Sequence, residues 1–207
     1  MFNTTEKRER RLGTRLFLKG TRCQSPKCVN ARRPTPPGAH GKDRQRPLSE
    51  FGTQLREKQK FQWSYGLREA QMKRVFKEAM KNAAVTGDVF LSFLERRLDN
   101  VAYRLGFGAS RAVARQLVGH GHLFVNGRKV TVPSYRVRPN DVISIRPQSK
   151  EHAGLKDLAE TLKAYEPPTW LSMNKETLEG KVVAMPKDFD NSFDVNMVVD
   201  YYSKVVK

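Results

Sequence analysis

The chain has 207 residues, of which 38% are hydrophobic and 29% are charged, and its formal net charge is +18. This length is sufficient for one or two domains with real cores, and no apolar run approaches the ~18 residues that a membrane span requires. Two cysteines are too few for a disulfide scaffold, and we expect no secretory signal because no apolar stretch follows the basic N-terminus. Membrane-spanning and disulfide-rich secreted proteins are therefore excluded, and the cytoplasm is the expected location.

The positive charge is concentrated in the first three quarters of the chain. The net charge is +9 for residues 1–50, +4 for 51–90, +7 for 91–147 and −2 for 148–207. This gradient indicates a polyanion-binding surface. Nucleic acid is favoured, because no basic amphipathic helix or lipidation signal of a membrane-surface protein is clear. The first 50 residues are also rich in proline, so we predict either a disordered arm or an arm that RNA or a metal ion orders.

Helical periodicity dominates the next stretch of the chain. Helices are predicted, in chain order, at residues 48–65, 68–83 and 88–105 and directly after Ser110. Ser49 and Ser110 are candidate N-caps. In the second helix the apolar residues form one stripe, and a row of lysines that includes Lys73 and Lys77 forms another. One face of that helix is therefore expected to pack and another to be cationic.

Beyond Gly121 the apolar period changes from 3.6 to 2. Strands are predicted on both sides of Asn126-Gly127, a common hairpin turn, and at residues 141–146. The two preceding helices and these strands therefore make a small helix–helix–antiparallel sheet unit. Later in the chain we predict helical structure at 151–165, a short strand at 181–185 and a helix at 195–205. These elements together predict an α+β fold.

A series of short motifs runs in order along nearly the whole chain. The motifs include Cys23-x4-Cys28, Arg32-Arg-Pro34, Leu55 to Lys60, Arg97 to Asn100, Tyr103 to Phe107, Val125 to Val130 and Pro133 to Pro139. Together they resemble the bacterial-type S4 family of small-subunit ribosomal proteins. The parts that the resemblance implies are a basic arm at 1–47, a helical domain at 48–90, an RNA-binding module at 91–150 and a C-terminal segment at 151–207 that folds back on the helical domain.

Basic side chains are predicted to form the RNA-binding surface. Arg111 and Arg115 share one side of the short helix, and Arg128 and Lys129 stand at the hairpin. Double-stranded RNA is recognised mostly through phosphates and 2′-hydroxyls, and arginine suits bidentate phosphate contacts; a merely solvated helix face is the alternative. The predicted RNA-binding residues are Arg32, Arg33, Lys42, Arg44, Arg46, Lys58, Lys60, Lys73, Lys77, Arg111, Arg115, His120, His122, Asn126, Arg128, Lys129, Arg136 and Arg138.

Two further patterns could indicate catalysis or metal binding, but they favour other roles. Arg97-Leu98-Asp99 resembles the context of the catalytic aspartate in some pseudouridine synthases, but it lies within a helical pattern and no further domain of catalytic size follows. We therefore expect Asp99 to make an ion pair or a hydrogen bond, and we predict no catalytic residue. His120 and His122 have no further metal ligands nearby in the sequence, so RNA contact or turn packing is expected for both.

Cys23 and Cys28 raise the question of zinc. Zinc-carrying members of the S4 family have a second Cys-x-x-Cys pair upstream, and the corresponding positions here are Glu6 and Glu9. Structural zinc sites use mostly cysteine and histidine, so we predict buried thiols and neither a metal nor another cofactor. A site of two thiolates and two carboxylates is the alternative.

The resemblance implies a structural constituent of the small ribosomal subunit that is not an enzyme. The expected partners are the 5′ domain of small-subunit rRNA, neighbouring ribosomal proteins and mRNA near the entry path, and no membrane. The protein is expected to nucleate assembly of the 5′ domain and to contribute to decoding fidelity in the cytoplasmic ribosome. An RNA-modifying enzyme and a free-standing RNA-binding factor that uses the same module are the alternatives.

Overall fold

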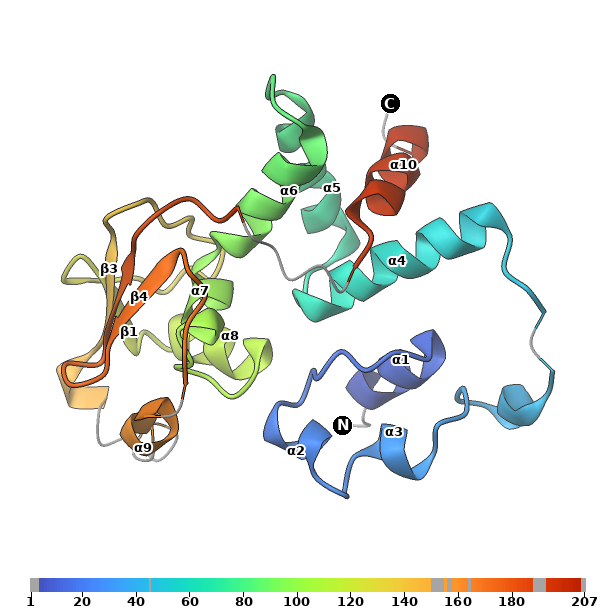
Figure 1. The fold of residues 1–207 in the computed structure, drawn as a ribbon, viewed down its shortest axis with the longest axis horizontal. Helices are drawn as coiled ribbons and strands as arrows, with labels where there is room; N and C mark the ends of the chain where they lie inside the picture. Colours follow the sequence, from blue (N-terminus) through green and yellow to red (C-terminus); the bar gives the residue numbers. More distant parts are fainter. Residues whose placement is uncertain are drawn as a thin grey trace. The chain divides into compact units, whose positions relative to one another are not determined.

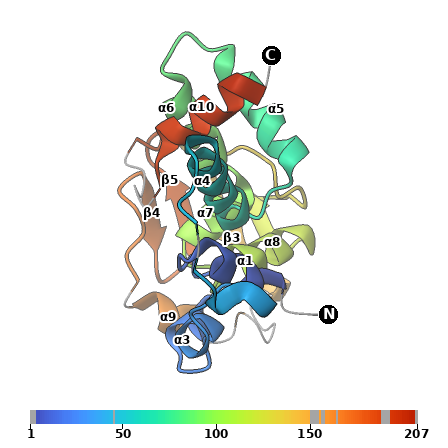
Figure 2. The ribbon, with the colours of Figure 1, turned by 90° about the vertical axis from the view of Figure 1, so that its right-hand side faces the viewer.

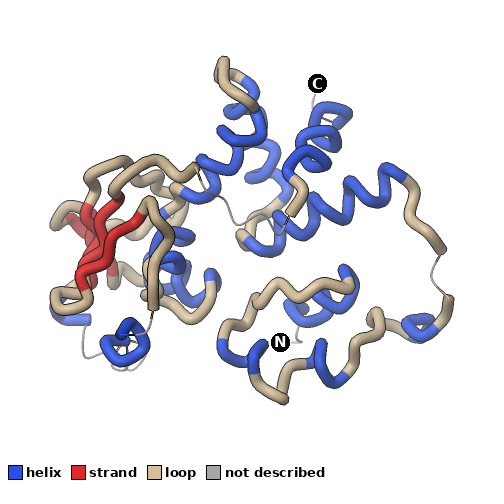
Figure 3. Tube along the Cα trace, in the orientation of Figure 1, coloured by secondary structure: helices blue, strands red, loops and turns tan. Residues whose placement is uncertain are grey.

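The chain forms two compact units. The computed structural model describes residues 4–44, 46–149, 155, 158–163, 165–187 and 193–205. One unit, here called the helical unit, comprises Met1–Gly87 and Asp190–Lys207, and the other, the sheet unit, comprises Asp88–Phe189. Figures 1 and 3 show helices throughout the described chain and strands in the sheet unit. No helix among the described residues is long and apolar enough to cross a membrane.

The first part of the helical unit is built from short helices. They are α1 (Thr4–Leu12), α2 (Thr21–Gln24), α3 (Val29–Arg32) and the 3-10 helix η1 (Ala39–Lys42). The buried carboxylate of Glu9 joins α1 to the loop that follows it and to α3, because it accepts hydrogen bonds from the backbone N–H groups of Leu16 and Leu18 and from Nδ2 of Asn30. Side-chain hydrogen bonds therefore supply order where the sequence shows no periodicity.

Longer helices form the rest of the helical unit. They are α4 (Glu50–Ser64), α5 (Glu69–Met80) and α10 (Val195–Val205), close to the predicted helices at 48–65, 68–83 and 195–205. Ser49 caps α4 as predicted, since its hydroxyl accepts a hydrogen bond from the N–H of Gly52. Helix α10 packs against α4 (Figure 2), and the centre of the Tyr202 ring lies 5.0 Å from that of Phe76 in α5. The end of the chain is thus an integral part of this unit.

The sheet unit combines helices with a five-stranded antiparallel sheet. Its elements are α6 (Thr86–Glu95, which begins at the boundary), α7 (Leu98–Arg104), α8 (Arg111–Gly119), β1 (Leu123–Val125), β2 (Arg128–Lys129), β3 (Val142–Ile145), η2 (Pro147–Ser149), α9 (Leu158–Lys163), β4 (Leu171–Asn174) and β5 (Glu179–Val182). The strand order is β2-β1-β3-β5-β4. Asn126 and Gly127 both have positive φ, as a type I′ hairpin turn requires. The predicted α+β class is confirmed.

One buried cluster joins the helices to the sheet. Leu98 of α7, Leu105 at the C-cap of that helix, Leu123 of β1 and Ile143 of β3 are fully buried in it. Close packing also explains Gly180, because a Cβ atom there would lie 2.4 Å from Cδ1 of Leu105. The core therefore fixes α7 and α8 rigidly against the sheet (Figure 1).

Two expectations about the elements need correction. The predicted helix at 88–105 is two helices, because Arg97 is extended and pairs with Arg136, while the N–H of Leu98 donates to the carbonyl of Tyr135. The C-terminal segment, 151–207, was expected to fold back as a whole on the helical domain. Instead, β5 pairs with β3, so β4 and β5 extend the sheet of the module. Residues 151–154, 156–157 and 164 of the predicted helix at 151–165 lie outside the described residues.

Candidate nucleic-acid interface

Helix α8 presents two arginines on its outer side. The hydroxyl of Ser110 caps the helix by accepting a hydrogen bond from the N–H of Val113, as the sequence predicts. Ala114, Leu117 and Val118 are buried against the core. Arg111 and Arg115 lie off that buried stripe and are partly exposed. Their spacing of four residues places both guanidinium groups on one face.

The α8 arginines contact polar side chains of α7. Nε of Arg111 donates to Oδ1 of Asn100 at 2.8 Å, and its guanidinium lies 4.6 Å from the centre of the Tyr103 ring. Nε of Arg115 lies 3.9 Å from Oδ2 of Asp99. Asp99 is also paired with Arg97 through two hydrogen bonds, in line with the structural role that the sequence indicates. Two cationic side chains are therefore held at defined positions.

The β1–β2 hairpin contributes a second group of predicted residues. Arg128 and Lys129 are exposed on β2. Asn126 has an internal function in the turn, because its Oδ1 accepts from the N–H of Val142 and its Nδ2 donates to Asp141. The hairpin therefore presents two cations on a turn that is fixed by side-chain hydrogen bonds.

The two histidines lie just after α8. His120 is exposed at the C-cap of the helix, and Nδ1 of His122 is hydrogen-bonded to Oγ of Ser149 at 2.9 Å. The centres of the two rings are 6.0 Å apart. His122 therefore contributes to local packing, whereas His120 is accessible to a ligand.

A third group of arginines surrounds the backbone of Val137. The guanidinium of Arg136 lies 4.2 Å from the centre of the Phe93 ring, and Arg138 is exposed. Sequence reasoning missed Arg96, whose Nε donates to the carbonyl of Val137 at 2.9 Å. Burial, together with the positive charges of Arg136 and Arg138, lowers the pKa of Arg96. The Arg96-Arg97 doublet is a basic signal in the sequence, but the sequence does not show that Arg97 is the more buried of the two.

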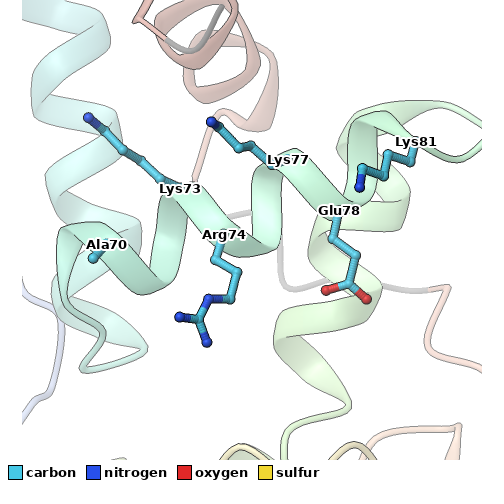
Figure 4. A pocket seen from close by; sticks show the side chains of 6 residues that line it. All are labelled: Ala70, Lys73, Arg74, Lys77, Glu78 and Lys81. Carbon is cyan, nitrogen blue, oxygen red and sulfur yellow. The ribbon is translucent and has the colours of Figure 1, made fainter.

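Basic side chains of α5 border a surface groove of about 600 Å³. Lys73 and Lys77 project from one side of the helix, and Arg74 and Glu78 project from another (Figure 4). Lys81 continues the cationic row past the end of the helix. The lysine stripe that the sequence predicts is thus accessible along α5.

The two lysines of α4 that are predicted to contact RNA, Lys58 and Lys60, are not accessible to the same degree. Lys58 is only 6% exposed, its Nζ lies 2.7 Å from Oε2 of Glu69, and it faces the ring of Tyr201. We correct its predicted role, since this cation is used inside the helical unit. Lys60 is partly buried and paired with Glu57 on the same helix.

The predicted residues of the arm are at the surface. Arg32 lies in α3, Lys42 lies in η1, and Arg33, Arg44 and Arg46 lie in irregular segments. All five are exposed. The arm therefore offers accessible positive charge, whereas Lys58 does not.

The residues around Cys23 and Cys28 do not fit a zinc ion. Both thiols are buried, and burial raises the pKa of Cys23. The carboxylate of Glu9 is used by three hydrogen bonds, and that of Glu6 lies 3.3 Å from Nε of Arg22. Among the described residues, no three His, Cys, Asp or Glu side chains are grouped as a metal site requires. Hydrogen bonds and ion pairs hold this part of the arm instead.

Comparison with known proteins covers nearly the whole chain. The ribosomal protein S4/S9 N-terminal domain matches residues 3–95, and the S4 domain matches residues 96–143. Small ribosomal subunit protein uS4 of Halothermothrix orenii is 52% identical over 197 residues, which is 94% of each chain. The proteins of the same name from Thermus thermophilus and Gloeobacter violaceus are 49% and 50% identical over the same share. The chain therefore belongs to the uS4 family, whose members are ribosomal proteins of the small subunit and not enzymes.

Proposed function

We propose that this protein binds small-subunit rRNA with the face formed by α8 and the β1–β2 hairpin. The fixed arginine pair on the outer side of α8 carries the proposal, since Arg111 and Arg115 are four residues apart and have defined partners. Membership of the uS4 family supports ribosomal RNA as the ligand. Exposed cations of the arm and of α5 add to the same electrostatic attraction.

The chemistry of the face suits an A-form RNA backbone. The deep groove of such RNA excludes side chains, so phosphates and 2′-hydroxyls are the groups within reach. Guanidinium groups match two phosphate oxygens at once, and Arg128 and Lys129 add charge at the hairpin. Recognition is then by the shape of a folded RNA, with affinity that falls steeply as salt is raised.

We also propose the place and the consequence of this binding. The protein binds the 5′ domain of the rRNA early in assembly, contacts neighbouring ribosomal proteins in the ribosome, and influences decoding fidelity near the mRNA entry path. Its family membership and the spread of exposed cations over both units support this role. Asp99 argues against an RNA-modifying enzyme, because it is 4% exposed and paired with Arg97.

Crosslinking of the full chain to total RNA, with sequencing of the bound fragments, tests the proposal. We expect enrichment in the 5′ domain of small-subunit rRNA, and we expect Arg111→Ala/Arg115→Ala to reduce it. Asp200→Ala, an exposed change on α10, serves as the control. Enrichment in transfer RNA or large-subunit rRNA would contradict the proposal. Sedimentation apart from small subunits at high salt would favour a free-standing RNA-binding factor.

A further inference from the structure

A buried polar cluster lies beneath the arginines of α8. It consists of Glu95 at the end of α6, Arg97, and Asp99, Asn100 and Arg104 of α7. Glu95, Arg97, Asp99 and Asn100 are each at most 5% exposed. Buried polar groups must be hydrogen-bonded to avoid a large desolvation penalty, so this cluster needs an explanation beyond ordinary packing.

Each buried carboxylate of the cluster has its own guanidinium partner. Asp99 accepts from Nε and Nη2 of Arg97 at 3.1 and 2.9 Å. Glu95 accepts from Nε and Nη2 of Arg104 at 3.2 and 3.1 Å. The negative charge of the cluster is therefore balanced within it, and Asn100 is neutral. Contact with the cluster can orient the α8 arginines without cancelling their positive charge.

The orientation of the Asn100 amide is fixed by its neighbours. Its Nδ2 donates to the backbone carbonyl of Glu95 at 3.0 Å and to Oε2 of Glu95 at 2.7 Å. Oδ1 is thereby directed away from Glu95 and accepts from Nε of Arg111 at 2.8 Å. The ring of Tyr103 contacts the same guanidinium. A guanidinium has five N–H donors, and the bond to Asn100 uses the one on Nε.

We propose that Asn100 is a positioning residue for RNA binding, because it holds the guanidinium of Arg111 in place before RNA is bound. Ordering a long side chain at an interface costs about 0.5–1.5 kcal/mol, which corresponds to about a two- to tenfold loss of affinity. Because Asn100 already orders Arg111 in the free protein, RNA binding avoids this loss. The inference rests on the proposed function, since it assumes that Arg111 contacts RNA. Asn100 itself stays buried and contacts only protein.

The test compares Asn100→Ala, Arg111→Ala and the double variant with the unaltered protein. The probe is a transcript of the 5′ domain of small-subunit rRNA, titrated at several salt concentrations. Arg111→Ala removes a phosphate contact and should lower the slope of log affinity against log salt by about one. Asn100→Ala keeps that charge and should weaken binding about two- to tenfold at unchanged slope. The double variant should bind no more weakly than Arg111→Ala.

A structural control separates positioning from a general loss of folding. Ile143→Val removes one methylene from the core and should lower the melting temperature with no change in RNA affinity. Arg111→Lys keeps the charge but loses both the Nε–H donor to Asn100 and the guanidinium fork. Arg128→Lys, at an exposed site on the hairpin, loses the fork and is the matched control, so the positioning role predicts a larger loss of affinity for Arg111→Lys than for Arg128→Lys even if Asn100→Ala folds poorly. The positioning role is overturned if Asn100→Ala weakens binding by the same factor in the Arg111→Ala background. Failure of Arg111→Ala to alter affinity or slope would instead overturn the proposed RNA-binding face.

Discussion

Replacing Asp99 by alanine is the most direct test of the buried ion pair in the sheet unit. The change leaves the guanidinium of Arg97, which is 5% exposed, without the carboxylate that accepts two of its hydrogen bonds. Removing one partner of a buried pair typically costs about 3–5 kcal/mol. For a chain of about this length, 1 kcal/mol corresponds to about 2–4 °C in Tm. We therefore expect Asp99→Ala to lower Tm by about 6–20 °C.

The assay is thermal unfolding followed by circular dichroism at neutral pH. Asp99→Asn keeps an oxygen for the Nε of Arg97 and for the N–H of Asn100, and it should cost less than alanine. Asp200→Ala removes an exposed carboxylate, so its effect on stability should be within about 0.5 kcal/mol. A Tm shift below about 2 °C for Asp99→Ala would refute the reasoning. Loss of an RNA-modifying activity without loss of stability would point to catalysis.

Three further changes have expected outcomes. Burial and a neighbouring carboxylate raise the pKa of Tyr202 above its ordinary value, so only the unfolded state releases this proton near pH 10. Stability measured in urea titrations should therefore fall as pH rises above about 10, and it should fall less steeply in Tyr202→Phe; an equally steep fall in that variant would contradict the role of Tyr202. Gly180→Ala places a methyl group against Leu105 and should cost about 1–3 kcal/mol; an unchanged urea midpoint would contradict the close packing. Ser49→Ala removes the cap of α4 and should cost about 1 kcal/mol, and an unchanged Tm would argue against the cap.

Local signals in the sequence were sufficient for most helices and for the hairpin. Serines at 49 and 110 cap α4 and α8, and Asn126-Gly127 forms the turn between β1 and β2. Strand β4 was missed because its alternating pattern, Leu171–Asn174, is only four residues long, which is too short for periodicity alone to identify a strand. Its position is determined by pairing with β5, which in turn pairs with β3. Pairing between segments that are far apart in the sequence cannot be recognised from a local pattern of residues.

The sequence was sufficient to predict which basic residues share a face, but not which of their side chains are buried or paired. Arg111 and Arg115 share the outer side of α8 because helical spacing dictates it. The burial of Lys58 depends on Glu69 and Tyr201, which belong to two other helices, so no local pattern distinguishes it from an exposed lysine. The contact between Asn100 and Arg111 likewise arises only when α7 and α8 pack together.

The salt dependence of rRNA binding by Arg111→Ala/Arg115→Ala tests the central claim most directly. The affinity of the full chain for a 5′-domain transcript would be measured from 50 to 200 mM salt, beside the Tm of each protein. We predict that the double change lowers the slope of log affinity against log salt by about two. The change in Tm should be small beside that of Asp99→Ala, because Asp99 retains Arg97 as its partner and Asn100 keeps both of its hydrogen bonds to Glu95. An unchanged slope and affinity, or a collapse of Tm that explains the loss of binding, would contradict the proposed role of this face.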